Sequence, residues 1–190
     1  MGILDPKKRE AILRAALMLF SKIGFEATSV AQIANEAKIA TGSIYVYFQN
    51  KEEIFEALYI QCKNLFYEYL KKNYNEEANP RENFKALFQG MVLFSREEKD
   101  AFIFLEFHYQ KPYLQKESLK IKNEVDSFLA KYVEDGIKKG KIQKQKPEIV
   151  IAIVYGAFVA IFKIIDSGKM NHSKKLFEEI EETLWEAIKI

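Results

Sequence analysis

The residues best suited to chemistry lie between Thr41 and Lys51, where small, hydroxyl-bearing and aromatic side chains follow one another. Ile44 and Phe48 are four residues apart, so in a helix they share one apolar face. The opposite face then consists of Gly42, Ser43, Tyr45, Val46 and Gln49. Such a face allows close backbone approach and offers hydrogen bonds to phosphates and base edges, so it is suited to binding DNA.

A second apolar pattern precedes this segment and predicts the element that positions it. Val30, Ile33, Ala34 and Ala37 fall on one helical face, and residues 38–40 interrupt the pattern before it restarts. Two short helices, a tight turn and the start of a longer helix form a helix-turn-helix. This motif places one helix in the major groove of DNA.

The stretch from about Lys8 to Leu58 resembles the TetR (TetR/AcrR) family of one-component transcriptional regulators. The residues that carry the resemblance are Ala15-Ala16 with Phe20, Gly24-Phe25, Thr28, Ile33-Ala34 with Ala37, Gly42 to Phe48 (GSIYVYF) and Asn50 to Ile54 (NKEEI). The family usually has Gly where this chain has Lys38. Gly adopts the left-handed conformation cheaply, whereas Lys costs on the order of 1 kcal/mol. Lys38 therefore either strains the turn or reaches a phosphate.

The resemblance implies a set of DNA-binding residues. Thr41, Gly42 and Tyr45 would lie near the bases, whereas Ser43, Tyr47 and Lys51 would face phosphates. Either Thr28 or Ser29 caps the first motif helix, since both carry a hydroxyl group there. The predicted set is Thr28, Ser29, Lys38, Thr41, Gly42, Ser43, Tyr45, Val46, Tyr47 and Lys51. The alternatives are a solvated Lys51 and a packed Tyr47. Gln49 is the first Arg, Asn or Gln in the recognition helix, which favours shape and hydroxyl readout over bidentate base contacts.

Composition favours a binding protein over an enzyme. Residues 1–51 contain seven Lys or Arg and four acids, whereas the remaining residues contain 22 and 23, so the excess positive charge coincides with the motif. The chain has two histidines and one cysteine, and it contains no metal-ligand spacing, phosphate loop or nucleophile motif. We therefore predict no catalytic residues, no metal and no cofactor.

The same inventory predicts a cytoplasmic protein. Cys62 is alone, so an internal disulfide is impossible and a reducing compartment fits. Residues 1–10 carry charges where a signal peptide would be apolar. The longest uncharged run, residues 149–162, is shorter than the ~20 residues that span a bilayer, which predicts a buried helix and no membrane partner.

Periodicity predicts an all-α fold of about nine helices. After the motif, helices are expected near residues 51–73, 80–96, 97–110, 112–139, 147–167 and 173–189. We expect a three-helix DNA-binding domain over 1–50, a connecting helix over 51–73 and a helical effector-binding and dimerisation domain over 74–190.

Aromatic residues are abundant in the second half of the chain, and most should be core. By resemblance, a subset lines a cavity for a small effector: Phe66, Phe88, Met91, Phe107, Tyr109, Phe128 and Tyr155. Such a pocket would be mostly apolar and would suit an acyl chain, an acyl-thioester or an aromatic compound.

The last two helices are apolar enough to pair with a second copy of the chain. The predicted dimer interface contains Val154, Phe158, Ile161, Leu184 and Trp185, and the alternative is burial within one subunit. The resulting hypothesis is a homodimeric repressor that a small apolar effector releases from a palindromic operator. The alternative is a TetR-like architectural or cell-cycle DNA-binding protein without an effector.

Overall fold

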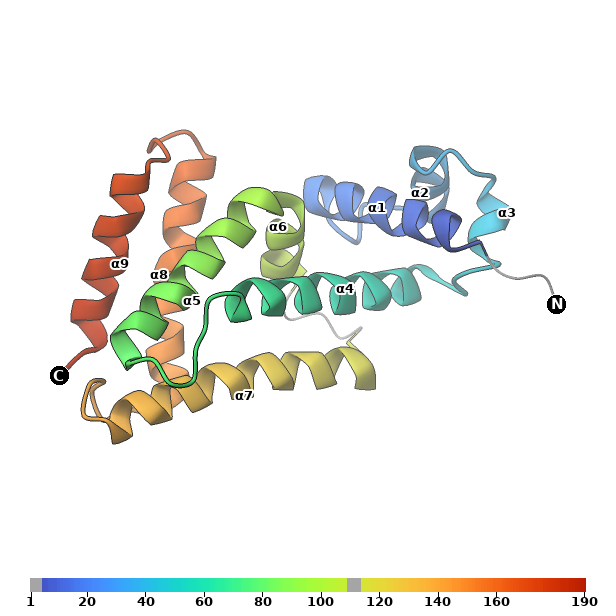
Figure 1. Ribbon diagram of the computed structural model, residues 1–190. Coiled ribbons are helices and arrows are strands. Elements are labelled where there is room, and N and C mark those ends of the chain that lie inside the picture. Colours follow the sequence, from blue (N-terminus) through green and yellow to red (C-terminus); the bar gives the residue numbers. More distant parts are fainter. Residues whose placement is uncertain (1–4, 109–113) are drawn as a thin grey trace. The chain divides into compact units, whose positions relative to one another are not determined.

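The computed structural model describes residues 5–108 and 114–190, which form nine helices (Figure 1). They are α1 (Pro6–Ile23), α2 (Val30–Glu36), α3 (Thr41–Ile44), α4 (Lys51–Lys71), α5 (Pro80–Glu97), α6 (Lys99–His108), α7 (Lys116–Lys138), α8 (Pro147–Asp166) and α9 (Lys174–Ile188). Strands are absent from these two ranges, and an antiparallel bridge joins Ile142 to Lys189. The all-α fold expected from the periodicity is confirmed.

Local capping chemistry sets several of the helix ends. The Asp5 carboxylate accepts a hydrogen bond from the Lys7 backbone N–H at 2.9 Å, and Pro6 occupies the first turn of α1. This helix ends at Gly24, whose φ of 83° few other residues adopt without strain. At α4, the Asn50 side chain accepts from the Glu53 backbone N–H at 2.8 Å.

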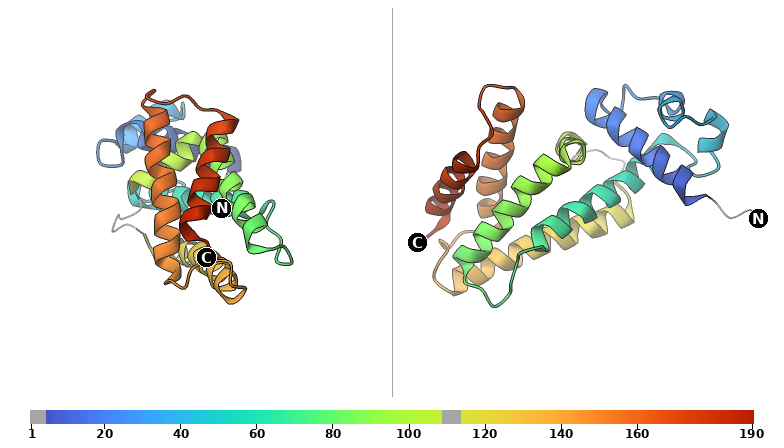
Figure 2. Two further views of the ribbon diagram at one scale, coloured as in Figure 1. Left: turned by 90° about the vertical axis from the view of Figure 1, so that its left-hand side faces the viewer. Right: turned by 45° about the horizontal axis from the view of Figure 1, so that its top comes forward.

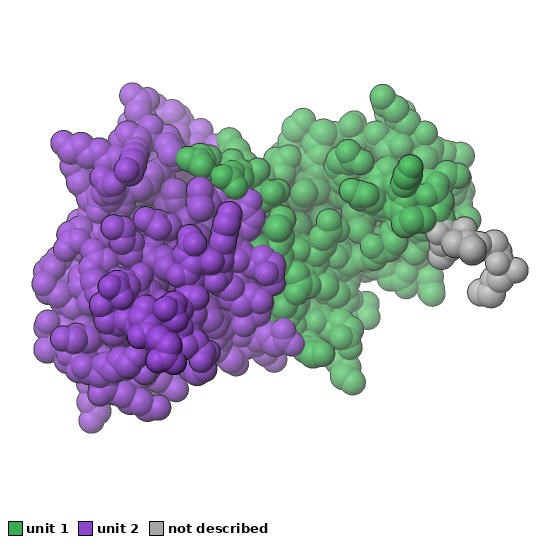
Figure 3. All heavy atoms as spheres, viewed as in Figure 1, with its two compact units in different colours: residues 1–66, 95–122 green, residues 67–94, 123–190 purple. Residues whose placement is uncertain are grey.

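The chain divides into two compact units, coloured in Figure 3. The first comprises residues 1–66 and 95–122, and the second comprises residues 67–94 and 123–190. The helix-turn-helix therefore shares a unit with α6 and most of α4. This division follows the packing of the helices. It differs from the functional domains expected from the sequence, whose boundaries fall after residues 50 and 73.

Phenylalanine rings form the core of the first unit. Phe20 of α1 stacks on Phe104 of α6 with ring centroids 6.0 Å apart. Phe25 meets Phe55 of α4 edge to face at 5.2 Å. All four rings are at most 1% exposed. Nearby on α4, burial raises the pKa of the Cys62 thiol to about 12, so this thiol is neutral at physiological pH.

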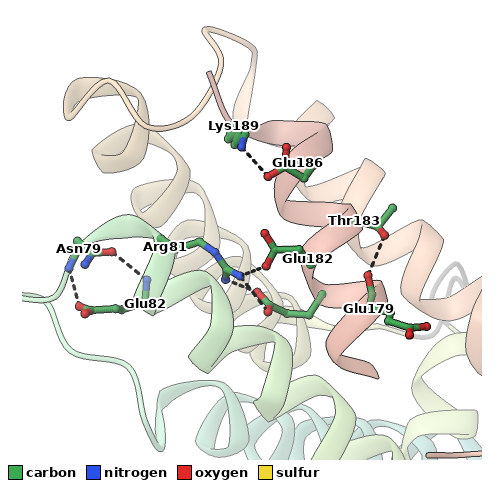
Figure 4. A network of polar contacts seen from close by, with 9 residues as sticks. Asn79, Arg81, Glu82, Glu179, Glu182, Thr183, Glu186 and Lys189 are labelled. Carbon is green, nitrogen blue, oxygen red and sulfur yellow. Dashed lines mark hydrogen bonds and ion pairs between the residues drawn. The ribbon is translucent and has the colours of Figure 1, made fainter. Parts of the chain in front are cut away.

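The second unit is held by aromatic contacts and by one ion-pair network. Phe84 of α5 lies 5.4 Å from Trp185 of α9. Arg81 forms ion pairs with Glu181 and with Glu182, the latter at 2.6 Å, and Figure 4 shows the Glu182 contact between α5 and α9. Burial raises the pKa of Tyr132, whose hydroxyl donates to the Pro80 carbonyl at 3.0 Å. Figure 2 shows α8 and α9 side by side in both views.

Helix α8 is more exposed than the sequence led us to expect. It is long and apolar enough to cross a membrane by length and composition alone, with a mean hydropathy of 2.3, yet 11% of its most apolar window is buried. Ile149 and Ile153 are each 45% exposed and Ile164 is 39% exposed. Burial of α8 within the single chain is thus incomplete, and its burial against a second copy stays a prediction. The exposed face of α8 lacks charge along most of its length.

Close packing of α4 on α5 predicts the effect of one substitution. A Cβ atom at Gly90 would lie 2.5 Å from the Tyr69 carbonyl oxygen, a backbone atom that cannot move independently. Gly90→Ala should therefore lower the free energy of unfolding by about 1–3 kcal/mol, as overpacking does. Chemical denaturation measures this change, with Gln89→Ala at an exposed neighbouring position as the control. Equal stability of the two variants would contradict the packing described here.

Candidate nucleic-acid interface

Helix α2 begins with a complete capping box. The Ser29 hydroxyl accepts from the Gln32 backbone N–H at 3.2 Å, and the Gln32 side chain accepts from the Ser29 backbone N–H at 2.7 Å. This arrangement resolves the choice between two capping residues in favour of Ser29. Thr28 is 1% exposed and its hydroxyl donates to the Gly24 carbonyl at 2.7 Å. The Thr28 side chain thus stabilises the α1–α2 connection and is not at the surface.

The turn between α2 and α3 has the strain that the sequence suggested. Lys38 adopts a φ of 57°, in the left-handed region. Its backbone N–H donates to the Asn35 carbonyl, and the Ile39 N–H donates to the Ala34 carbonyl at 3.0 Å. These two bonds form a Schellman motif, which usually places Gly at the left-handed position. The Lys38 side chain is exposed.

Helix α3 and the turn that follows it present the predicted outward face. Ile44 and Phe48 are 1% and 5% exposed, whereas Tyr45 and Val46 are 56% and 62% exposed. Thr41 and Gly42 are also exposed, and Ser43 and Tyr47 are half-buried. Regular helix ends at Ile44, and the Tyr47 N–H donates to the Ile44 carbonyl at 2.8 Å, so the helix is shorter than the apolar spacing indicated. The surface combines small, hydroxyl and aromatic groups without a carboxylate.

Lys51 has contacts that the sequence did not reveal. Its ammonium group donates to the Phe25 carbonyl at 2.7 Å and to the Thr28 carbonyl at 2.9 Å, and it lies 4.2 Å from the centroid of the Phe25 ring. The side chain is half-buried. These contacts use two of the three ammonium N–H groups, and the phosphate contact expected of Lys51 stays a prediction. No spacing rule identifies a bond between a side chain and a backbone carbonyl 23 residues away.

The residues predicted to line an effector pocket belong to both compact units. Phe66 is 3% exposed and lies in the first unit. In the second unit Phe88 and Met91 are buried, whereas Phe128 and Tyr155 are half-buried. The side chain of Phe107 and the whole of Tyr109 lie outside the described residues. The pocket therefore stays a prediction.

Part of the predicted dimer interface lies inside the chain. Phe158, Leu184 and Trp185 are 1%, 7% and 7% exposed, and Phe158 meets Phe88 edge to face. These three side chains are core and cannot serve as an outer surface. Val154 and Ile161 are half-buried. The helical period separates the inner face of α8 from the outer face, which contains Ile149, Ala152, Ile153, Gly156, Ala160 and Ile164. Residue type alone does not separate the two faces of α8, because isoleucine and alanine occur on both.

Comparison with known proteins identifies the family. The profile of bacterial regulatory proteins of the tetR family matches residues 12–58, and that of the tetracyclin repressor-like C-terminal domain matches residues 59–190. The chain belongs to the TetR family. Members of this family are DNA-binding transcriptional regulators with a helix-turn-helix.

Individual relatives of this TetR-family chain agree with the assignment. It is 26% identical over 160 residues to the HTH-type transcriptional regulator YhgD of Bacillus subtilis, covering 81% of this chain and 82% of that protein. It is 24% identical over 140 residues to the fatty acid metabolism regulator protein of the same organism, covering 70% of each. A TetR-family regulator from Marinobacter aquaeolei has the same fold, with a TM-score of 0.87, 19% identity and 97% coverage of each chain.

The left-handed Lys38 predicts an unusual gain in stability. Lys38→Gly should raise the free energy of unfolding by about 0.5–1 kcal/mol, because Gly adopts this conformation without the penalty that a Cβ imposes. The control is Asn35→Gly in α2, where Gly should lower the free energy of unfolding by a few tenths of a kcal/mol or more. Thermal unfolding of both variants measures the difference, and destabilisation by both would disprove the strain at Lys38.

Proposed function

We propose that this TetR-family protein is a cytoplasmic repressor that binds a near-palindromic operator as a homodimer and is released by a small apolar effector. The observation that supports the DNA contact most strongly is the surface of α3 and its following turn. Ile44 and Phe48 anchor this segment in the core, so Tyr45 and Val46 are held outward. A rigidly anchored, uncharged surface of this kind can enter the major groove.

Phosphate contacts would surround this recognition surface. Lys7, Lys8 and Lys38 are exposed in the same unit, and Arg9 lies 5.3 Å from the centroid of the Phe48 ring. Ser43 and Tyr47 contribute hydroxyl groups on the flank of the recognition turn. Cationic and hydroxyl groups bind the DNA backbone and fix the register of the protein, whereas Thr41, Gly42, Tyr45 and Val46 would discriminate between bases.

The outer face of α8 supports self-association. Ala152, Gly156 and Ala160 are exposed at intervals of four residues, and exposed isoleucines flank them. Beyond its neighbours and the adjacent backbone of α8, a Cβ atom at Gly156 would meet no atom of the described residues within 4 Å. Because Gly inside a helix costs about 1 kcal/mol relative to Ala, packing within the chain does not explain this residue. A second α8 crossing closely at Gly156 would explain it, with two copies of α8 and α9 forming a four-helix interface.

An apolar effector is supported by composition and by one relative. The predicted pocket residues are aromatic or sulfur-containing, and the relative named a fatty acid metabolism regulator protein covers 70% of this chain. Acyl chains and acyl-thioesters fit such a surface better than polar metabolites do. Helix α4 is continuous through Phe66 and begins at the DNA-binding motif, so a ligand that displaces it would change the spacing of the two recognition surfaces.

Selection of duplexes from a random DNA library tests the DNA-binding proposal. The purified protein should enrich a near-palindrome whose half-sites are centred about one helical turn, or a multiple of it, apart. Affinity should fall steeply with salt, because phosphate contacts release counterions. Tyr45→Ala should alter the preferred sequence, whereas the control Gln61→Ala on the exposed middle of α4 should not. Failure to enrich any sequence would contradict the proposal.

The dimer is tested by light scattering in the absence of detergent. The wild-type protein should have twice the chain mass of 22.2 kDa, and Ile153→Glu should reduce it to a single chain, because the introduced carboxylate would be buried at the interface. Ile23→Glu is a matched control, since Ile23 is 48% exposed and Ile153 is 45% exposed. A wild-type mass of one chain at micromolar concentration would rule out the dimer.

Ligand control of DNA binding is tested by titrating palmitoyl-coenzyme A and palmitate against the free protein and against its complex with the selected duplex. Linkage requires that DNA weakens ligand binding by the same factor by which ligand weakens DNA binding, typically about 5- to 150-fold. Phe66→Ala should diminish the response while leaving DNA affinity in the absence of ligand nearly unchanged. Equal ligand affinity in the two titrations, or no binding in either, would favour the architectural alternative.

A further inference from the structure

The first residue of α4 is bonded to the connection that precedes the DNA-binding motif. The Lys51 ammonium donates one hydrogen bond to the Phe25 carbonyl oxygen at 2.7 Å and another to the Thr28 carbonyl oxygen at 2.9 Å. The same ammonium lies 4.2 Å from the centroid of the Phe25 ring, close enough for a cation–π interaction. One side chain from α4 therefore contacts residues 23 and 26 positions earlier in the sequence.

These contacts act on the segment that determines where α2 begins. Thr28 immediately precedes Ser29, the N-cap of α2. Phe25 packs against Phe55, one turn further along α4 from Lys51. The Thr28 backbone N–H and hydroxyl are also bonded locally, to the Phe25 and Gly24 carbonyls at 3.2 and 2.7 Å. The connection is thus a compact turn in which Lys51 donates to the Thr28 carbonyl and adds a second hydrogen bond to the Phe25 carbonyl.

The chemistry of the ammonium favours a positioning role over a phosphate contact. Hydrogen bonds from a charged donor are stronger than neutral ones, and removing the donor leaves the carbonyls of a half-buried turn without this partner. Two of the three N–H groups already point at these carbonyls. A freely solvated lysine, or one devoted to phosphate, would not be held against an aromatic ring and two backbone oxygens.

We propose that Lys51 is a positioning residue that holds α2 and the recognition turn in register with α4. Its loss would reduce affinity for the operator much more than affinity for unrelated DNA, because the recognition surface would lose its orientation while the surrounding phosphate contacts remain. The proposal rests on the proposed function in one respect, that DNA is the ligand. The contacts of Lys51 with Phe25 and Thr28, called the clamp below, are present in the protein without DNA.

The experiment compares Lys51→Met, Lys51→Gln and the control Lys22→Met, which removes an exposed lysine from the end of α1. Amide hydrogen exchange of residues 24–32 is measured first, without DNA. Exchange should accelerate in Lys51→Met, accelerate less in Lys51→Gln, which keeps N–H donors without the charge, and stay unchanged in Lys22→Met. Unchanged exchange in Lys51→Met would overturn the clamp.

Equilibrium binding to the selected operator and to an unrelated duplex of equal length follows, over a series of salt concentrations. Lys51→Met should weaken operator binding about tenfold or more, as expected for the loss of charge-assisted hydrogen bonds. Binding to the unrelated duplex should change little, and the slope of affinity against salt should stay that of the wild type. Lys51→Gln should recover part of the operator affinity.

A different pattern would overturn the positioning role. If Lys51 binds phosphate instead, both variants should lose operator and unrelated DNA affinity equally, and the salt slope should fall by about one. If the wild-type protein enriches no duplex at all, the proposed function fails, and the hydrogen-exchange measurement still decides whether the clamp exists.

Discussion

A cluster of four phenylalanine rings holds the DNA-binding motif to the rest of its unit. Phe20, Phe25, Phe55 and Phe104 come from α1, the α1–α2 connection, α4 and α6, and each is almost completely buried. Burying such a side chain contributes about 1.5–3 kcal/mol, and the net stability of a domain is about 5–15 kcal/mol. The motif is too small to fold around a core of its own, so the position of its recognition surface depends on this cluster.

The cluster also determines which elements can influence DNA binding. Helix α6 is distant from the motif in the sequence, yet Phe104 stacks on Phe20 and the Ser21 hydroxyl donates to the Asp100 carboxylate at 3.2 Å. Under the proposed mechanism, a ligand that shifts α6 therefore acts directly on α1. Helix α4 supplies a second route, because it carries Phe55 in the cluster and Lys51 at the turn before α2.

The sequence predicted the helices and the orientation of the recognition turn, because both follow from short-range patterns. Ile44 and Phe48 are four residues apart, and this spacing alone places Tyr45 and Val46 outward. Short-range patterns do not predict contacts between residues that lie far apart in the sequence. The bonds of Lys51 to two backbone carbonyls have no signature in side-chain type, and the inner and outer faces of α8 look alike because isoleucine and alanine occur on both. The strained backbone at Lys38 was predictable, because the left-handed conformation at the end of a helix usually requires Gly.

Methylation interference on the selected duplex tests most directly whether α3 of each subunit enters the major groove. Dimethyl sulfate methylates guanine N7 in the major groove and adenine N3 in the minor groove, so it reports which groove the recognition surface enters. Guanine N7 methylation should block binding in two zones related by the two-fold symmetry of the site. Interference confined to adenine N3, or a single zone, would contradict major-groove insertion of α3 by a symmetric dimer.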